Sequence, residues 1–321
     1  MSKKMKCSIC MNLLLSKEEY ITHLQNCHRK KYEEYMNSIL ELNNTDYVLN
    51  YEMYFEYGNH NLIHEHGNIY CINNKSIKTW NPSNFKMEAS TIWSFPNRGD
   101  WATHNSKYRG NWSPYIPRNI ILRYSNEGDS VLDQFVGSGT TLVETKLLNR
   151  AGIGVDINPD ALEISKLNLD FQRAGCMEPV LHHGDARNLS FLADNSVDLI
   201  CTHPPYANII KYSDGIVGDL SLYEDIDQFI IELKKVAAES YRVLKSNKYC
   251  AILMGDTRRK RHIIPLGFKV MDTFLNAGFV LKEIVIKEQH NCKASGFWYQ
   301  KSIEYNFLLI AHEYLFIFRK P

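Results

Sequence analysis

Short runs of apolar residues alternate with stretches that carry apolar residues at helical spacing over most of residues 118–318. The short runs, each typical of a buried strand, fall at 130–132, 151–155, 180–183, 196–201 and 249–254. The helical patterns fall at 118–125, 142–149, 159–171, 227–244 and 265–277. This alternation predicts an α/β protein with a doubly wound, mostly parallel sheet. Two more strand patterns, 279–287 and 307–318, follow the last helix and predict an antiparallel last strand.

The first predicted strand leads into a glycine turn at 133–141, DQFVGSGTT, and a helix follows the turn. Gly137 and Gly139 let the backbone pass close to a ligand, because glycine has no side chain and tolerates positive φ. The helix start offers unpaired N–H groups and a partial positive charge. A strand, a glycine turn and a helix start are the Rossmann-type arrangement for a cofactor. Asp156 follows about 20 residues later, where a carboxylate can accept the hydroxyls of an adenosine ribose.

The composition is that of an ordinary globular protein, and the small net charge excludes a strong electrostatic field around the whole molecule. The 321 residues are 44% hydrophobic and 23% charged, with a net charge of +1. A nucleic-acid partner would therefore need local basic patches. The N-terminus is basic and then reaches cysteines, unlike a signal peptide, and no apolar run has the length that spans a bilayer. We predict a cytoplasmic protein with no membrane partner.

Three of the eight cysteines lie within the first 27 residues. Cys7 and Cys10 form a tight pair, His23 follows, and Cys27 and His28 are alternative fourth ligands. Two thiolates, an imidazole and one more ligand a helical turn away can close a tetrahedron around zinc. This spacing predicts a structural zinc site in a finger-like segment.

We expect three parts along the chain, with boundaries set by shifts in composition. Residues 1–40 would be the zinc-finger-like segment with a helix, and residues 41–92 a small region of short strands and loops. Residues 93–321 would form the main α/β domain.

Four features follow in order at the carboxyl ends of predicted strands one to four: the turn at 133–141, Asp156, Asp185 and the Pro204-Pro205-Tyr206 motif. In this combination the chain resembles the DNA amino-methyltransferases. That family methylates the N4 amine of cytosine or the N6 amine of adenine, using S-adenosyl-L-methionine. The segments 113–117 and 312–315 are similar to further motifs of the family, and the resemblance covers residues 93–321. It implies a methyltransferase of Rossmann-like fold.

The resemblance also implies which residues bind the cofactor. These are residues of the turn, the two later aspartates and the upstream prolines: Asp133, Phe135, Gly137, Gly139, Thr140, Thr141, Asp156, Asp185, Ala186, Pro114 and Pro117.

The implied catalytic residues are His203, Pro204, Pro205 and Tyr206. The amine is a poor nucleophile because its lone pair is delocalised into the ring. A proline pair holds a backbone carbonyl rigidly outward to accept an amine hydrogen. Tyr206 would stack on a base flipped out of double-stranded DNA, a contact worth about 1–3 kcal/mol.

The chain departs from the family at His203, where most adenine enzymes have Asp or Asn and most cytosine enzymes Ser. A neutral imidazole nitrogen can accept an amine hydrogen, so catalysis is compatible with this residue. Thr202 resembles the cytosine pattern more, which favours N4 of cytosine and leaves N6 of adenine open.

The usual target-recognition insertion is missing, because the loops after Tyr206 and Leu253 are short. Specificity is then expected from residues 1–92. Two basic or aromatic stretches are further candidates for DNA contact, with Arg258, Arg259, Lys260 and Arg261 in the first and Lys293 and Trp298 in the second.

Three functions stay open from the sequence. The favoured one is a site-specific DNA methyltransferase, for which a cognate restriction endonuclease is a candidate partner. The second is an RNA methyltransferase of the tRNA type that modifies the N2 amine of guanine. The third is a zinc-dependent DNA-binding regulator without catalysis.

Overall fold

The structure is a computed structural model that describes residues 77–173, 175–290 and 295–321, together with four short strands nearer the N-terminus. The described residues fall into two compact units, one of them Lys78–Leu169 with Arg173–Pro321 and the other Met1–Ile77 with Asp170–Gln172. In the described parts of the chain, no helix is long and apolar enough to cross a membrane.

The smaller unit has two antiparallel strand pairs, which are β1 (Met5–Lys6) with β2 (Leu13–Leu14) and β3 (Asn61–Glu65) with β4 (Asn68–Ile72). The five candidate zinc ligands, Cys7, Cys10, His23, Cys27 and His28, lie outside the described residues. The zinc site and the predicted domain limits therefore stay predictions.

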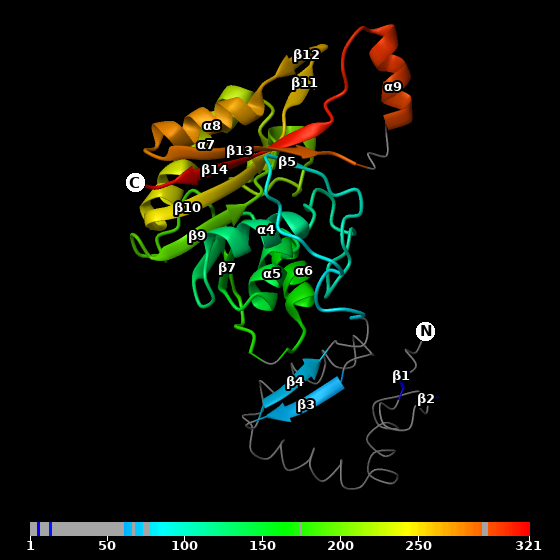
Figure 1. Cartoon of the computed structure of the whole chain (residues 1–321), viewed down its shortest axis with the longest axis vertical. Coiled ribbons are helices and arrows are strands. Elements are labelled where there is room, and N and C mark those ends of the chain that lie inside the picture. Colours follow the sequence, from blue (N-terminus) through cyan, green and yellow to red (C-terminus); the bar gives the residue numbers. More distant parts are fainter. Residues whose placement is uncertain are drawn as a thin grey trace. The chain divides into compact units, whose positions relative to one another are not determined.

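The larger unit is built on an eight-stranded sheet with the order β5-β13-β14-β10-β9-β6-β7-β8 (Figure 1). Its strands are β5 (Ile92–Trp93), β6 (Ser130–Asp133), β7 (Ala151–Asp156), β8 (Val180–His183), β9 (Val197–Thr202), β10 (Leu244–Met254), β13 (Val280–Glu288) and β14 (His312–Arg319). Only β14 runs antiparallel to its neighbours among these strands. The predicted doubly wound, mostly parallel sheet with an antiparallel last strand is confirmed.

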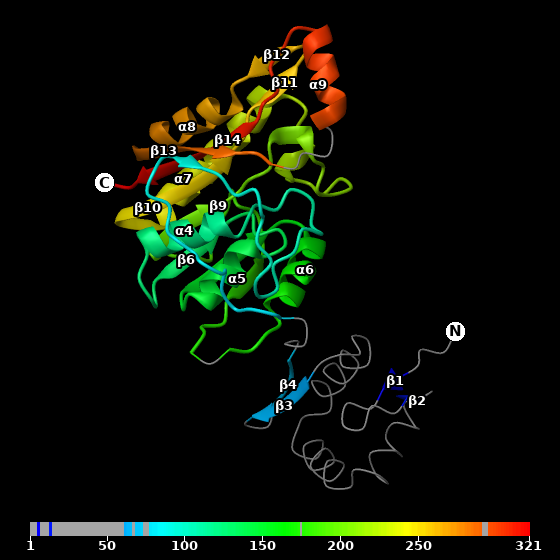
Figure 2. The ribbon, with the colours of Figure 1, turned by 45° about the vertical axis from the view of Figure 1, so that its right-hand side comes forward.

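Helices cover both faces of this sheet. They are α4 (Tyr115–Tyr124), α5 (Thr140–Leu147), α6 (Pro159–Leu169), α7 (Ile226–Val243) and α8 (Leu266–Asn276). The first three lie together, apart from α7 and α8, in both views (Figures 1 and 2). Side chains alternate between the faces along each strand. Val131 therefore packs in the cluster that holds Ile120 of α4, whereas Leu132 packs in the cluster that holds Phe229 of α7.

Three local predictions are wrong. The helix predicted at 118–125 already begins at Tyr115, and Pro117 fits in its first turn, where the missing N–H has no helical partner. The last strand begins at His312 rather than at 307, and it lies inside the sheet between β10 and β13. The chain after Tyr206 is not a short loop, because it runs through two 3-10 turns, Ala207–Ile209 and Leu220–Leu222, before α7.

The fully buried carboxylate of Glu144, on α5, fastens the chain before α4 to the domain. It accepts hydrogen bonds from Trp101 Nε1 at 2.7 Å and from Arg118 Nη1 at 2.8 Å, and it lies 2.8 Å from His104 Nε2. A buried charge is tolerated only when it is paired and hydrogen-bonded. This cluster therefore holds the segment around Trp101 and His104 against α5.

Glu144→Gln should lower the free energy of unfolding by about 3–5 kcal/mol, because the buried Arg118 guanidinium would lose its ionised partner. Urea denaturation followed by circular dichroism measures this. The matched control is Glu163→Gln, which removes a solvent-exposed pair with Lys166 and should leave the midpoint unchanged. Equal midpoints for all three proteins would show that the buried cluster does not stabilise the fold.

Candidate active site

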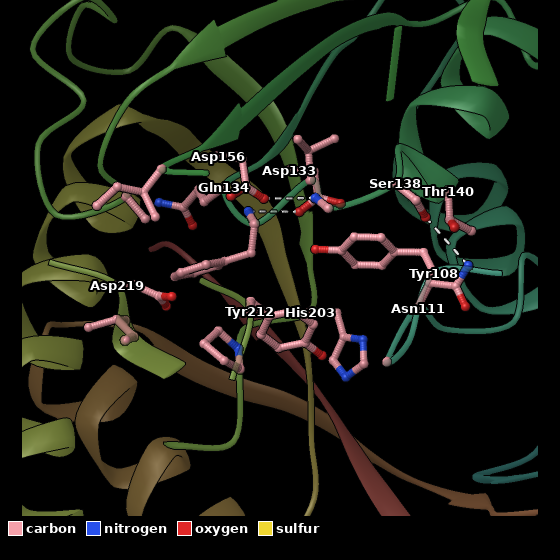
Figure 3. A pocket seen from close by; sticks show the side chains of 18 of the residues that line it. Tyr108, Asn111, Asp133, Gln134, Ser138, Thr140, Asp156, His203, Tyr212 and Asp219 are labelled. Atoms are coloured by element: carbon pink, nitrogen blue, oxygen red, sulfur yellow. Dashed lines mark hydrogen bonds between the residues drawn. The ribbon is translucent and has the colours of Figure 1, made fainter. Parts of the chain in front are cut away.

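A pocket with about 750 Å³ of empty space opens at the carboxyl ends of β6, β7 and β9 (Figure 3). The sheet order reverses here, since β6 pairs with β7 on one side and with β9 on the other. Ligands of open α/β sheets bind at such a reversal.

Asp133, at the end of β6, lies at the floor of the pocket and is 2% exposed. Its carboxylate accepts from the Thr141 hydroxyl at 2.5 Å, the Thr202 hydroxyl at 2.7 Å and the Phe135 N–H at 3.1 Å. Burial raises the pKa of Asp133 to about 6, although these hydrogen bonds act in the opposite direction. Asp133 thus connects β6, the glycine turn, α5 and β9.

Asp156, at the end of β7, holds the glycine turn from the other side. Its carboxylate accepts from the Gly137 N–H and the Asn158 N–H, both at 2.9 Å, and burial raises its pKa. Gly139 has a φ of +82°, and a Cβ there would lie 3.0 Å from Ser165 Oγ on α6. The positive φ therefore favours glycine at this position, and the contact with Ser165 leaves little space for a side chain.

Asp185, after β8, lines the same pocket with the neighbouring Ala186. Arg187 binds both of its carboxylate oxygens, with Nε at 2.9 Å from Oδ1 and Nη2 at 2.5 Å from Oδ2, and also pairs with Glu232 on α7. These bonds hold Asp185 in place before any ligand arrives.

The wall opposite the glycine turn comes from two loops that the sequence did not mark as functional. Tyr108 and Tyr212 face each other with ring planes 11° apart and centroids 6.0 Å apart. Burial raises the pKa of both phenols, that of Tyr212 to about 12. Asp219 lies beside them in the lining, 5% exposed, and its carboxylate accepts from Ser213 and Ser221.

The far end of the pocket is formed by the residues after β9. His203 and Pro205 line it, and the His203 ring stacks on Trp112 with centroids 5.4 Å apart. Burial lowers the pKa of His203 to about 4, so the imidazole is neutral at neutral pH. Pro204 is buried, and Tyr206 lies half-buried outside the lining, its hydroxyl 2.8 Å from His203 Nε2.

Most of the predicted cofactor residues come together in this one pocket. Those in the lining are Asp133, Phe135, Gly137, Thr140, Asp156, Asp185 and Ala186. The four outside it are Gly139, Thr141, Pro114 and Pro117. Thr141 is fully buried and its hydroxyl is bonded to Asp133, so it positions the turn rather than facing the cavity.

The basic stretch after the fifth predicted strand forms a hairpin, β11 (Thr257–Arg259) with β12 (His262–Ile264). Lys260 and Arg261 make its turn with φ of +48° and +70°. Arg258 donates to the Leu308 carbonyl at 2.9 Å, and Arg259 donates to Asn208 Oδ1 at 2.9 Å. These side chains are therefore partly engaged within the protein.

The second candidate stretch contains α9 (Ser295–Glu304), a helix that the sequence did not predict. Trp298 on α9 is 49% exposed, and Phe297 and Tyr299 are also exposed. Lys293 lies outside the described residues. Figure 1 places α9 beside the β11–β12 hairpin, as does the cation–π contact of Arg261 with Tyr305 just after α9.

The DNA methylase family model N6_N4_Mtase matches residues 14–167 and 197–321. The chain belongs to this family. It is 42% identical over 87 residues to the Type II methyltransferase M.HpaI of Haemophilus parainfluenzae, 27% of each protein. It is 36% identical over 100 residues to the tRNA (guanine(10)-N2)-dimethyltransferase of Methanothermobacter thermautotrophicus, 31% of this chain and 29% of that protein. The match thus spans less than a third of either curated relative.

Among solved structures, the chain is similar to a SAM-dependent methyltransferase from Methanosarcina mazei. It is 18% identical, with a TM-score of 0.43, over 63% of this chain and 96% of that one.

Gly110→Ala should weaken binding of S-adenosylmethionine, the cofactor expected for the family, by at least about tenfold, or 1.4 kcal/mol. A Cβ at Gly110 would lie 1.9 Å from the Tyr212 hydroxyl, so Tyr212 would have to leave its place in the pocket wall. Isothermal titration calorimetry measures the affinity. Gly128→Ala is the control, because Gly128 has nearly the same φ, +82° against +83°, and no atom within 4 Å. Equal affinities in the two variants would exclude this wall from the cofactor site.

His203 should titrate near pH 4 rather than near 6.5, because burial disfavours its charged form. Histidine-selective NMR over a pH series measures this, with the resonance assigned through His203→Gln. A midpoint near 6.5 would mean that the ring is solvated and would contradict the burial seen here.

Proposed function

We propose that the chain transfers a methyl group from S-adenosylmethionine to an exocyclic amine of a DNA base, either N4 of cytosine or N6 of adenine. The observation that carries this proposal is a single pocket with two distinct ends, in a chain that belongs to the DNA methylase family. One end has the glycine turn and two carboxylates, Asp156 and Asp185. The other has the neutral His203 and the rigid Pro204–Pro205 pair.

The carboxylates suit the nucleoside part of the cofactor. Asp156 would accept the ribose hydroxyls and Asp185 the adenine amine, while Thr140 and the Asp133 turn would lie near the methionine part. The cofactor supplies an electrophilic methyl group on a sulfonium. The facing Tyr108 and Tyr212 rings would exclude water from this part of the pocket.

At the other end, acceptors for the amine hydrogens would be the His203 imidazole and the backbone carbonyl fixed by the proline pair. Accepting these hydrogens draws the nitrogen towards tetrahedral geometry and makes its lone pair available. Neither acceptor carries a full charge, so neither repels the base. Burial of His203 keeps the imidazole neutral and able to accept.

The target would be double-stranded DNA with the base flipped out, since the amine cannot reach the pocket within a duplex. Tyr206 would stack on the base. Arg258 to Arg261 and the exposed Trp298 are proposed DNA contacts, as are Lys293 and a zinc-finger segment at residues 1–40. A cognate restriction endonuclease and a cytoplasmic location belong to the same proposal.

The choice between the two amines rests on the sequence pattern before the proline pair. Thr202 favoured cytosine by its resemblance, but its hydroxyl is buried and donates to Asp133 at 2.7 Å. Thr202 therefore cannot contact a base in the pocket, and N4 of cytosine keeps only a slight preference from the sequence pattern.

A second candidate is methylation of the N2 amine of guanine in tRNA. It is favoured by similarity to tRNA (guanine(10)-N2)-dimethyltransferases, which for the Pyrococcus abyssi protein extends over 162 residues at 28% identity, 50% of this chain and 44% of that protein. A non-catalytic regulator is the third candidate, and it would bind cofactor without methyl transfer.

Nucleoside mass spectrometry on DNA and tRNA from a methylation-free host that expresses the full chain separates these candidates. N4-methylcytosine or N6-methyladenine in DNA supports the proposal and names the amine. N2-methylguanine in tRNA alone would overturn it for the second candidate, and no mark in either nucleic acid, with the purified protein binding cofactor, would favour the third.

Pro205→Ala should lower methylation at least about 100-fold. Without the Pro205 ring the backbone can rotate, and the carbonyl that is proposed to orient the amine is no longer held in place. Affinity for S-adenosylmethionine should stay within about twofold, since the glycine turn and both carboxylates are untouched. Radiolabelled methyl transfer and calorimetry measure the two effects. Loss of cofactor affinity equal to the loss of activity would contradict the assigned role.

A further inference from the structure

A continuous chain of hydrogen bonds runs from the last two strands to His203. Lys287 Nζ on β13 donates to Glu313 Oε2 on β14 at 2.9 Å. Tyr206 Oη donates to Glu313 Oε1 at 2.8 Å and lies 2.8 Å from His203 Nε2. The Glu313 and Lys287 side chains are only 10% and 16% exposed, so water competes little for these bonds.

The donors and acceptors in this series of hydrogen bonds allow each bond only one direction of donation. An ammonium group can only donate, and an ionised carboxylate can only accept. Burial opposes ionisation of Glu313, but the pKa of this carboxyl is lowered all the same, because the charged Lys287 lies beside it and both Lys287 and Tyr206 donate hydrogen bonds to it. Tyr206 therefore donates its single hydroxyl hydrogen to Glu313. In the bond to His203, the Tyr206 oxygen must then be the acceptor. His203 must then carry its hydrogen on Nε2.

A neutral imidazole has one N–H, so the other nitrogen, Nδ1, has a free lone pair. Nδ1 has no hydrogen-bond partner within the described ranges of the chain, and it is not among the buried atoms that lack one. The ring lines the pocket and is fixed by its stack on Trp112 (Figure 3 shows His203 at the pocket). The partner of Nδ1 should therefore be a hydrogen donor that enters the pocket.

We propose that Glu313 is a positioning residue that acts through Tyr206 to hold His203 in the Nε2–H tautomer, so that Nδ1 accepts a hydrogen of the target amine. This inference rests on the proposed function for the identity of the donor. The tautomer itself follows from the contacts within the protein. Lys287 fixes the carboxylate at the start of the chain of bonds.

The proposal explains how a histidine can stand before the proline pair. An isolated neutral imidazole has two tautomers, and only one of them presents a lone pair to the pocket. The Nδ1–H tautomer would instead point an N–H at the target amine. Two hydrogen-bond donors would then face each other, with no acceptor between them. A tyrosine bonded to a carboxylate removes this ambiguity.

Glu313→Gln tests the direction of the bonds while it keeps the side-chain shape. Lys287 can only donate, so it would take the amide oxygen of the new glutamine. The NH₂ group would then face Tyr206 and donate to its oxygen. Tyr206 would turn its own hydrogen towards His203 Nε2, and the histidine would carry its hydrogen on Nδ1.

The direct readout is the tautomer of His203, measured by NMR on the ¹⁵N-histidine-labelled full chain without nucleic acid. The expected result is Nε2–H in the unaltered protein and Nδ1–H in Glu313→Gln. Nδ1–H in the unaltered protein, or Nε2–H in both, would overturn the inference. This measurement needs no methyl transfer, so it stands apart from the test of the proposed function.

Activity provides a second readout. Glu313→Gln should lower kcat by about 100-fold or more, the usual scale of one positioned proton-transfer group, with an unchanged Kd for S-adenosylmethionine. Adding Lys287→Met should restore part of kcat, because the glutamine is then free to turn its oxygen to Tyr206. A merely structural role of Glu313 predicts the opposite, a further loss in the double variant.

The matched control is Glu283→Gln, a substitution of the same kind on β13 at a side chain that is 42% exposed. It should leave both the tautomer and kcat unchanged. If Glu283→Gln lowered kcat as much as Glu313→Gln did, the loss would come from a general disturbance of these strands and not from the hydrogen bonds to His203.

Discussion

The geometry of the site depends on the buried carboxylate of Asp133. Its three hydrogen bonds join the end of β6 to the glycine turn through Phe135, to the start of α5 through Thr141 and to the end of β9 through Thr202. Burying a carboxylate is unfavourable unless its lone pairs are satisfied, and here they are. Because one side chain ties the three elements together, the glycine turn and the residues after β9 keep a fixed separation. That separation sets how far the glycine turn and the proposed cofactor end of the pocket lie from His203.

Much of the sheet could be read from the sequence, because parallel strands that are buried on both faces appear as short apolar runs. The carboxyl ends of such strands meet at one edge, so Asp133, Asp156 and His203 could be placed together before the structure was known. Tyr108 and Tyr212 could not. They lie in polar loops without periodicity and meet only because the Glu144 cluster and the Asp219 hydrogen bonds bring those loops over the pocket. Contacts of that kind depend on tertiary packing, which no local pattern encodes.

The partner of Tyr206 was hidden for a similar reason. Glu313 lies 107 residues away in the chain, and its motif resembled one of the family without indicating what it touches. The register of the antiparallel strands decides the contact, because Glu313 is paired with Lys287 across β13 and β14. A shift by one residue would turn Glu313 to the other face. The residues at the end of β9 are thus linked to a strand pairing that lies beyond β10 in the sheet.

The place of β14 has a consequence for how the domain is made. Strands β10 and β13 are neighbours in the sheet only through β14, which pairs with both of them. During synthesis on the ribosome, β10 and β13 emerge first and have no partner between them until residues 312–319 follow. Unpaired strand edges are templates for association with other chains. The growing polypeptide therefore passes through a stage with two open edges, and the arrival of one strand closes both and delivers Glu313 to Tyr206 in the same step.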